Sequence, residues 1–135
     1  MKVFFCFGCL LLMTATAFSQ VEGRTIKWKA SSVTDVLTGS RTDHFKEVIS
    51  RPGQVDFISQ NGQLAASLAI TSRNGNWNDQ ATDGSTTVKV EAGAQKGQVI
   101  FKRVGGRLMV TLLLMESESR AIFDIDCSGF EVINP

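Results

Sequence analysis

The chain has 135 residues, of which 43% are hydrophobic and 20% are charged, and its net charge is +1 at pH 7. This length predicts one domain, and 12 Gly with only 2 Pro exclude collagen-like and Pro-rich classes. A nearly neutral chain has little attraction to nucleic acid or to anionic membrane surfaces, so no nucleic-acid partner is expected.

The first 19 residues have the features of a secretory signal peptide. Lys2 precedes an apolar run from Val3 to Met13, and the small residues Ala17 and Ser19 precede the expected cleavage site. That run is too short for a membrane span, which needs ~20 residues. We predict a signal peptide over 1–19 and a single exported β domain over 20–135. The mature protein is then secreted or periplasmic, with no transmembrane segment after cleavage.

Cleavage would leave a single cysteine, Cys127, in the mature chain. An internal disulfide is then impossible, so the domain must be stabilised by its core. Cys127 shares an apolar strand face with Phe123 and Ile125, and free cysteines are among the most buried residues. We therefore expect a buried thiol and a monomeric protein.

Alternation of apolar and polar residues with a period of two dominates the chain from Thr25 onward, which predicts β-strands. Thr25 to Ala30, for example, places Trp28 in the middle of one apolar face. Asn61-Gly62 and Gly105-Gly106 are typical of tight hairpin turns. The expected strands cover residues 25–30, 54–60, 63–71, 86–91, 98–104, 107–116 and 120–127, with a last short edge strand within 130–135.

Two segments are ambiguous. Residues 32–38 combine a Ser32/Asp35 capping pattern with apolar residues at helical spacing, which favours one short helix there. Residues 44–50 fit either a helix or a strand, and we predict a strand. The polar stretch 72–85 reads as the longest loop, in which Trp77 could mark a short strand.

Seven or eight strands joined by short connections predict an all-β antiparallel meander. Such a sheet buries its apolar face by closing as a small barrel or by folding as a sandwich. The opening Gly23 to Trp28 resembles the start of the lipocalin or calycin class, which implies a barrel. That class has one residue between Gly and Trp and this chain has four, so no site residues are carried over.

Residues for catalysis or metal binding are sparse. His44 is the only histidine, and with one mature cysteine it supplies too few soft ligands for zinc, iron or copper. The polar residues of the 72–85 loop do not follow a calcium-loop pattern. Asp124 and Asp126 share one strand face, which is more typical of a solvated surface than of an acid/base pair. We expect no enzyme activity and no cofactor.

Two functions remain. The first is an exported, non-enzymatic domain that binds an apolar or amphipathic small molecule inside the barrel. Its predicted ligand-binding residues are the large apolar side chains Trp28, Phe57, Leu68, Trp77, Phe101 and Phe123. The alternative is a secreted or envelope domain with a solid core and no ligand cavity, which contacts a protein partner through its surface.

Overall fold

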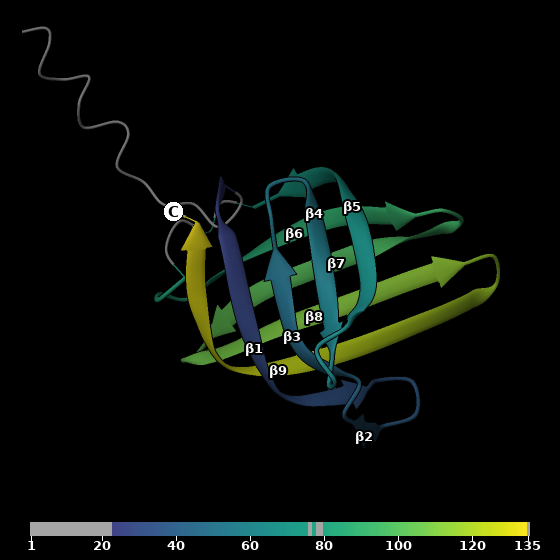
Figure 1. Ribbon diagram of the computed structural model, residues 1–135, viewed down its shortest axis with the longest axis horizontal. Helices are drawn as coiled ribbons and strands as arrows, with labels where there is room; N and C mark the ends of the chain where they lie inside the picture. The colour runs from purple at the N-terminus through teal and green to yellow at the C-terminus, as the bar shows by residue number, and fades with distance from the viewer. Residues whose placement is uncertain (1–22, 76, 78–79, 135) are drawn as a thin grey trace, which may run out of the picture.

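A computed structural model describes residues 23–75, 77 and 80–134, so the predicted signal peptide lies outside the described residues. The described chain forms nine β-strands and contains no α-helix (Figure 1). The strands are β1 (Thr25–Asp35), β2 (Ser40–Thr42), β3 (Phe45–Ser50), β4 (Gln54–Ser59), β5 (Leu64–Asn74), β6 (Gly84–Ala92), β7 (Gln95–Val104), β8 (Arg107–Glu116) and β9 (Ser119–Asn134).

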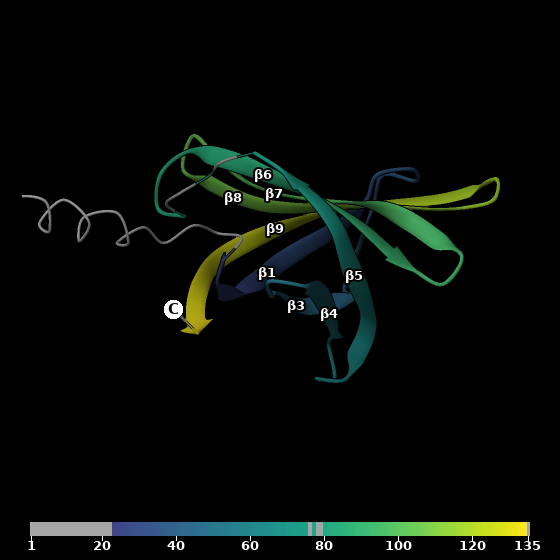
Figure 2. The same cartoon turned by 90° about the horizontal axis from the view of Figure 1, so that it is seen from above.

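The sheet closes on itself. Its strand order is β2-β1-β3-β4-β5-β6-β7-β8-β9, every neighbouring pair is antiparallel, and β1 also pairs with β9. This last pairing runs from Thr25 opposite Asn134 to Asp35 opposite Phe123 and joins the first and last long strands. The predicted antiparallel barrel is therefore confirmed, with eight strands in the closed sheet and β2 as an extra strand beside β1 (Figures 1 and 2).

The predicted short helix at 32–38 is wrong, because the first half of this segment belongs to β1, which ends at Asp35. Val33 is buried in the core, and this part of β1 pairs with both β2 and β9. Asp35 does act as a cap, but of a turn: its carboxylate accepts hydrogen bonds from the backbone N–H groups of Leu37 and Thr38. Gly39 ends this turn with φ at 77°, a conformation that suits glycine.

The ambiguous segment 44–50 forms a strand, β3, as predicted. The two strands expected at the C-terminus are instead one 16-residue strand, β9. Its last part is not an edge, because it pairs with β1 across a shift in register near Gly129. Trp77 is not in a strand and lies in the connection between β5 and β6.

Connections between antiparallel strands alternate between the two ends of the barrel. One end, here called the termini end, carries Thr25, Asn134, the 51–53 turn, the 75–83 loop and the 105–106 turn. The other, called the hairpin end, carries the turns at 36–39, 60–63, 93–94 and 117–118. Two of its hairpins, β6–β7 and β8–β9, reach beyond the rest of the barrel on the right of Figure 1.

Candidate functional site

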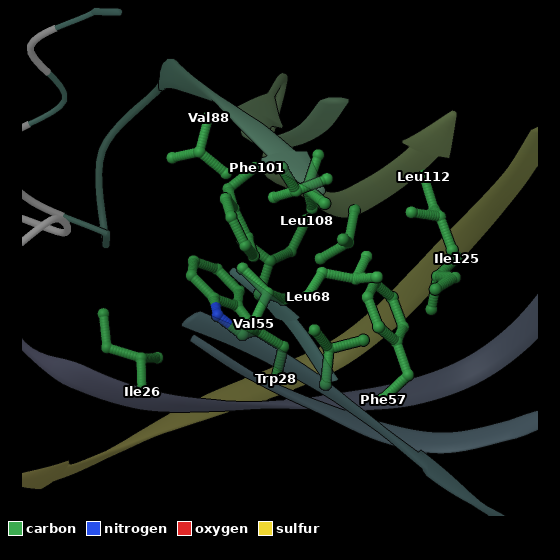
Figure 3. Packing of buried hydrophobic residues seen from close by; sticks show 14 of the residues in the cluster. Ile26, Trp28, Val55, Phe57, Leu68, Val88, Phe101, Leu108, Leu112 and Ile125 are labelled. Atoms are coloured by element: carbon green, nitrogen blue, oxygen red, sulfur yellow. The ribbon is translucent and has the colours of Figure 1, made fainter. Parts of the chain in front are cut away.

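The structure brings the six predicted ligand-binding residues into one core, where they pack against each other. Trp28, Phe57, Leu68, Trp77 and Phe101 are buried, and Phe123 is half-buried at the edge of the same cluster. The core is completed mainly by Ile, Val and Leu side chains from the surrounding strands (Figure 3). In the described part of the chain these six side chains therefore contact one another and fill the interior of the barrel.

Trp28 is the centre of this packing. Its ring lies 5.1 Å from the Phe101 ring in a stacked arrangement, 5.9 Å from Trp77 and 6.2 Å from Phe130, measured between centroids. Its indole N–H donates to the Ser50 hydroxyl at 2.9 Å, so the one polar atom of the side chain is satisfied. Such aromatic contacts add ~0.5–1.5 kcal/mol per pair beyond the burial itself.

A second aromatic group lies toward the hairpin end. Phe45 contacts Phe57 at 5.3 Å and Phe123 at 5.8 Å between ring centroids, and His44 lies edge-on to Phe123 at 5.6 Å. His44 is exposed. We interpret His44 as a polar margin of this aromatic group, because its ring contacts Phe45 and Phe123.

The hairpin end is also where large apolar side chains reach solvent. The exposed fractions are 43% for Val36, 48% for Leu37, 59% for Leu64 and 48% for Met115. We call these four residues the hairpin rim. A shallow open hollow of about 140 Å³ includes Met115 and lies at the hairpin-end parts of β7, β8 and β9. It is lined by Gln95, Leu114, Met115, Glu116, Ser119, Arg120 and Ala121.

A smaller hollow of about 10 Å³ lies at the termini end, beside the Trp28 and Phe101 pair. It is lined by Ser50, Arg51, Ile70, Arg73, Thr86, Val88 and Phe101. We call it the arginine hollow. Its volume is enough for about one group of the size of a water molecule, which needs ~10–15 Å³.

Trp77 and residues 80–83, between β5 and β6, lie at the termini end close to this hollow. Trp77 inserts into the core, and its indole N–H donates to the Thr82 carbonyl at 2.9 Å. Arg103 donates from Nε to the Gln80 carbonyl at 2.7 Å, which ties the loop to β7. The Asp83 carboxylate accepts from the backbone N–H of Gly105 at 3.0 Å, which ties it to the 105–106 turn.

The least exposed carboxylate of the described chain is Asp56 on β4, with 6% of its surface exposed. It accepts hydrogen bonds from Arg51 Nε at 3.0 Å, Gln54 Nε2 at 2.9 Å and Ser67 Oγ at 2.7 Å. Burial alone would raise the pKa of Asp56, but the bonds from Ser67, Arg51 and Gln54 outweigh it and lower the pKa below its ordinary value. Asp56 is therefore a charged and well-satisfied anchor for Arg51.

The two aspartates of β9 lie on the outer face of the barrel. Arg107 forms two hydrogen bonds with Asp126, at 2.8 and 3.1 Å, and Thr111 donates to Asp124 at 2.8 Å. These contacts join β8 to β9 across the sheet surface. Paired, hydrogen-bonded carboxylates on an open face match the solvated surface that the alternation predicts.

Cys127 is half-buried and packs against the core. Burial, and to a lesser degree the Asp126 charge, raises the pKa of its thiol to about 12. Because the thiolate is the reactive form, this thiol is a poor nucleophile at neutral pH. Among the described residues, no group of three or more His, Cys, Asp or Glu side chains is placed to hold a metal ion.

Sequence reasoning missed the arginine hollow and the hairpin rim. Arg51 follows the predicted strand 44–50 and Arg73 falls in the predicted loop 72–85, so only the closed barrel shows that both line one hollow. The rim residues come from three separate segments, β5, β8 and the turn after β1. Nothing in the local pattern connects them.

The part of the chain that the structure describes has no helix long and apolar enough to cross a membrane. Comparison with known proteins found no matching family model, no matching curated protein and no matching solved structure.

Proposed function

We propose that the protein is an exported, non-enzymatic β-barrel domain with a solid core that contacts a protein partner through the hairpin rim. The observation that carries this proposal is the packing around Trp28, whose neighbours Phe101, Trp77 and Phe130 occupy the space that an internal ligand would need. A partner would then bind to the outer surface of the barrel.

The hairpin rim is the best-supported contact area. Four of the six large apolar side chains with high exposure lie at this end of the barrel, while Val104 and Ile133 lie toward the termini end. Large exposed apolar areas mark protein contact sites, so we assign the contact to the end that carries most of these side chains. The projecting β6–β7 and β8–β9 hairpins would make this end accessible to a large partner (Figure 2).

Photo-crosslinking in the native host tests this assignment. A photoreactive amino acid at Leu37 or Leu64 should give a discrete crosslinked protein band. The same amino acid at Val104, which is 63% exposed at the opposite end, should give none. Equal crosslinking from both ends, or none from the rim, would reject the rim as the contact site.

A small ligand inside the barrel is the competing function. It requires Trp28 and Phe101 to separate, so a fatty acid that enters should quench tryptophan fluorescence saturably and remain bound in native mass spectra. We expect neither. Saturable quenching with a bound mass would replace the solid-core proposal with the ligand-binding one.

A further inference from the structure

We propose that the arginine hollow is a binding site for the carboxylate group of a small organic acid. This site is separate from the hairpin rim and does not depend on it. The argument rests on the charge of the lining, the hydrogen-bond donors that it leaves free, and its size.

The charge of the lining selects an anion. Of the seven described residues around the hollow, Arg51 and Arg73 carry positive charge and none carries negative charge. Asp56 holds Arg51 from outside the hollow and is already engaged by three donors. A guanidinium presents a planar fork that matches a carboxylate.

The donors that remain free point to the same ligand. Arg51 uses Nε for Asp56, and its two terminal nitrogens have no hydrogen-bond partner among the described residues. The Ser50 hydroxyl accepts from Trp28, which leaves its own proton available for an acceptor. The guanidinium of Arg51 and the hydroxyl of Ser50 are therefore the two donors that the hollow offers to a ligand.

The size and the floor of the hollow favour carboxylate over phosphate. About 10 Å³ accommodates roughly one oxygen atom, so the rest of the acid stays outside. Ile70, Val88 and Phe101 make the wall apolar. A strongly hydrated, multiply charged phosphate would lose more solvation there than a carboxylate.

Asp56 acts in this site as a positioning residue. Its contact with Arg51 Nε fixes the orientation of the guanidinium before a ligand arrives, which lowers the entropy lost on binding. The buried carboxylate and its three donors, Arg51 among them, then belong to one arrangement.

The test is a titration of the full mature protein with sodium butyrate at constant ionic strength, followed by NMR. The indole N–H of Trp28 is the reporter, because it bonds to Ser50 on the wall of the hollow. We expect saturable shifts of this signal and of the Ser50, Arg51 and Thr86 amides. Titration with sodium chloride should leave them in place.

Variants locate the site. Arg51→Gln should weaken butyrate binding about tenfold or more, because it removes a charge-assisted contact. Arg73→Gln should weaken it as well, because it removes one of the two positive charges of the lining. Asp56→Asn should weaken it less while keeping the saturable shift. Arg41→Gln removes an equal charge from β2 at the other end of the barrel and should change nothing. The amide spectrum of each variant shows whether the barrel is folded. If Arg51→Gln does not fold, Arg73→Gln still tests the site, because Arg73 is exposed.

Three results would overturn the proposal. The first is no saturable shift with butyrate. The second is an equal affinity in Arg51→Gln, Arg73→Gln and the unchanged protein. The third is tighter binding of phosphate than of butyrate, which would replace the carboxylate class.

Discussion

Gly97 on β7 lies so close to the backbone of β8 that there is no space for a side chain. A Cβ built there would lie 1.8 Å from the carbonyl oxygen of Leu113 on β8, and backbone atoms cannot move aside cheaply. We predict that Gly97→Ala destabilises the fold by about 1–3 kcal/mol or more. Gly129 is the matched control in β9: its added Cβ meets nothing within 4 Å, so Gly129→Ala should stay within about 0.5 kcal/mol. Urea unfolding measures both, and similar losses would contradict the steric argument.

The lowered pKa of Asp56 predicts how the stability of the protein depends on pH. Because its pKa is lowered in the folded state, ionised Asp56 stabilises the protein above the pKa of the unfolded chain, about 3.9. This contribution is lost as the pH falls through the lower, folded-state pKa. At pH 7, Asp56→Asn should therefore be less stable than the unchanged protein by about 1–3 kcal/mol.

The difference between the two proteins should shrink as the pH is lowered below the pKa of the unfolded chain. Chemical unfolding from pH 7 to the acid limit of the native state would show this convergence. A difference that stays constant with pH would mean that Asp56 acts by its shape and hydrogen bonds, and that its charge contributes nothing.

At the scale of elements, the connection between β5 and β6 also contributes to the core, through Trp77. Trp77 is 3% exposed and reaches the Trp28 ring, while Gly84 lies so close beneath it that a Cβ would meet Trp77 Cδ1 at 2.4 Å. Trp77→Ala should cost about 3–5 kcal/mol because it opens a cavity next to Trp28. Trp77→Phe keeps most of the ring volume and should cost less than half as much. Equal costs would indicate that the indole hydrogen bond, rather than packing, anchors the loop.

The elements differ in how far local sequence predicts them. Alternation located the central strands well, because half-buried strands must place apolar side chains on one face. The helix prediction for 32–38 failed because Val33 pairs with β9, far along the chain. The spacing of apolar residues within the segment carries no information on such partners. The polar β2 has no apolar pattern to detect. The pattern predicts a strand over 120–127 and a separate edge strand within 130–135, whereas the structure joins them into one strand across a register shift.

The site was less predictable than the fold, for a similar reason. The large apolar residues of the predicted pocket do lie together, but composition could not show that they fill the interior instead of surrounding a ligand. Arg51 and Arg73 are 22 residues apart in the sequence. They line one hollow because β4 and β5 pair in the sheet and bring their neighbouring residues together. A shared position of this kind follows from closure of the whole sheet.

At the scale of the whole molecule, closure depends on the pairing of β1 with β9, which also brings the two ends of the described barrel together. Thr25 lies opposite Asn134 in this pairing. A short Gly/Ser linker between these ends should therefore be tolerated, and new termini can be opened in an exposed turn. The 117–118 turn is suitable, because Ser117 and Glu118 are exposed and Ser117 has φ at 54°, which costs a non-glycine residue energy.

We predict that a circular permutant that begins at Glu118 and ends at Ser117 folds into the same barrel. Its circular dichroism should match that of the parent chain, and it should unfold cooperatively in urea. The same linker with new termini between Thr111 and Leu112 interrupts β8 inside the sheet, where it pairs with both β7 and β9. That control should fail to fold cooperatively. If the first permutant failed as well, the meeting of β1 and β9 would depend on chain order, and closure of the barrel would not be a property of the paired strands alone.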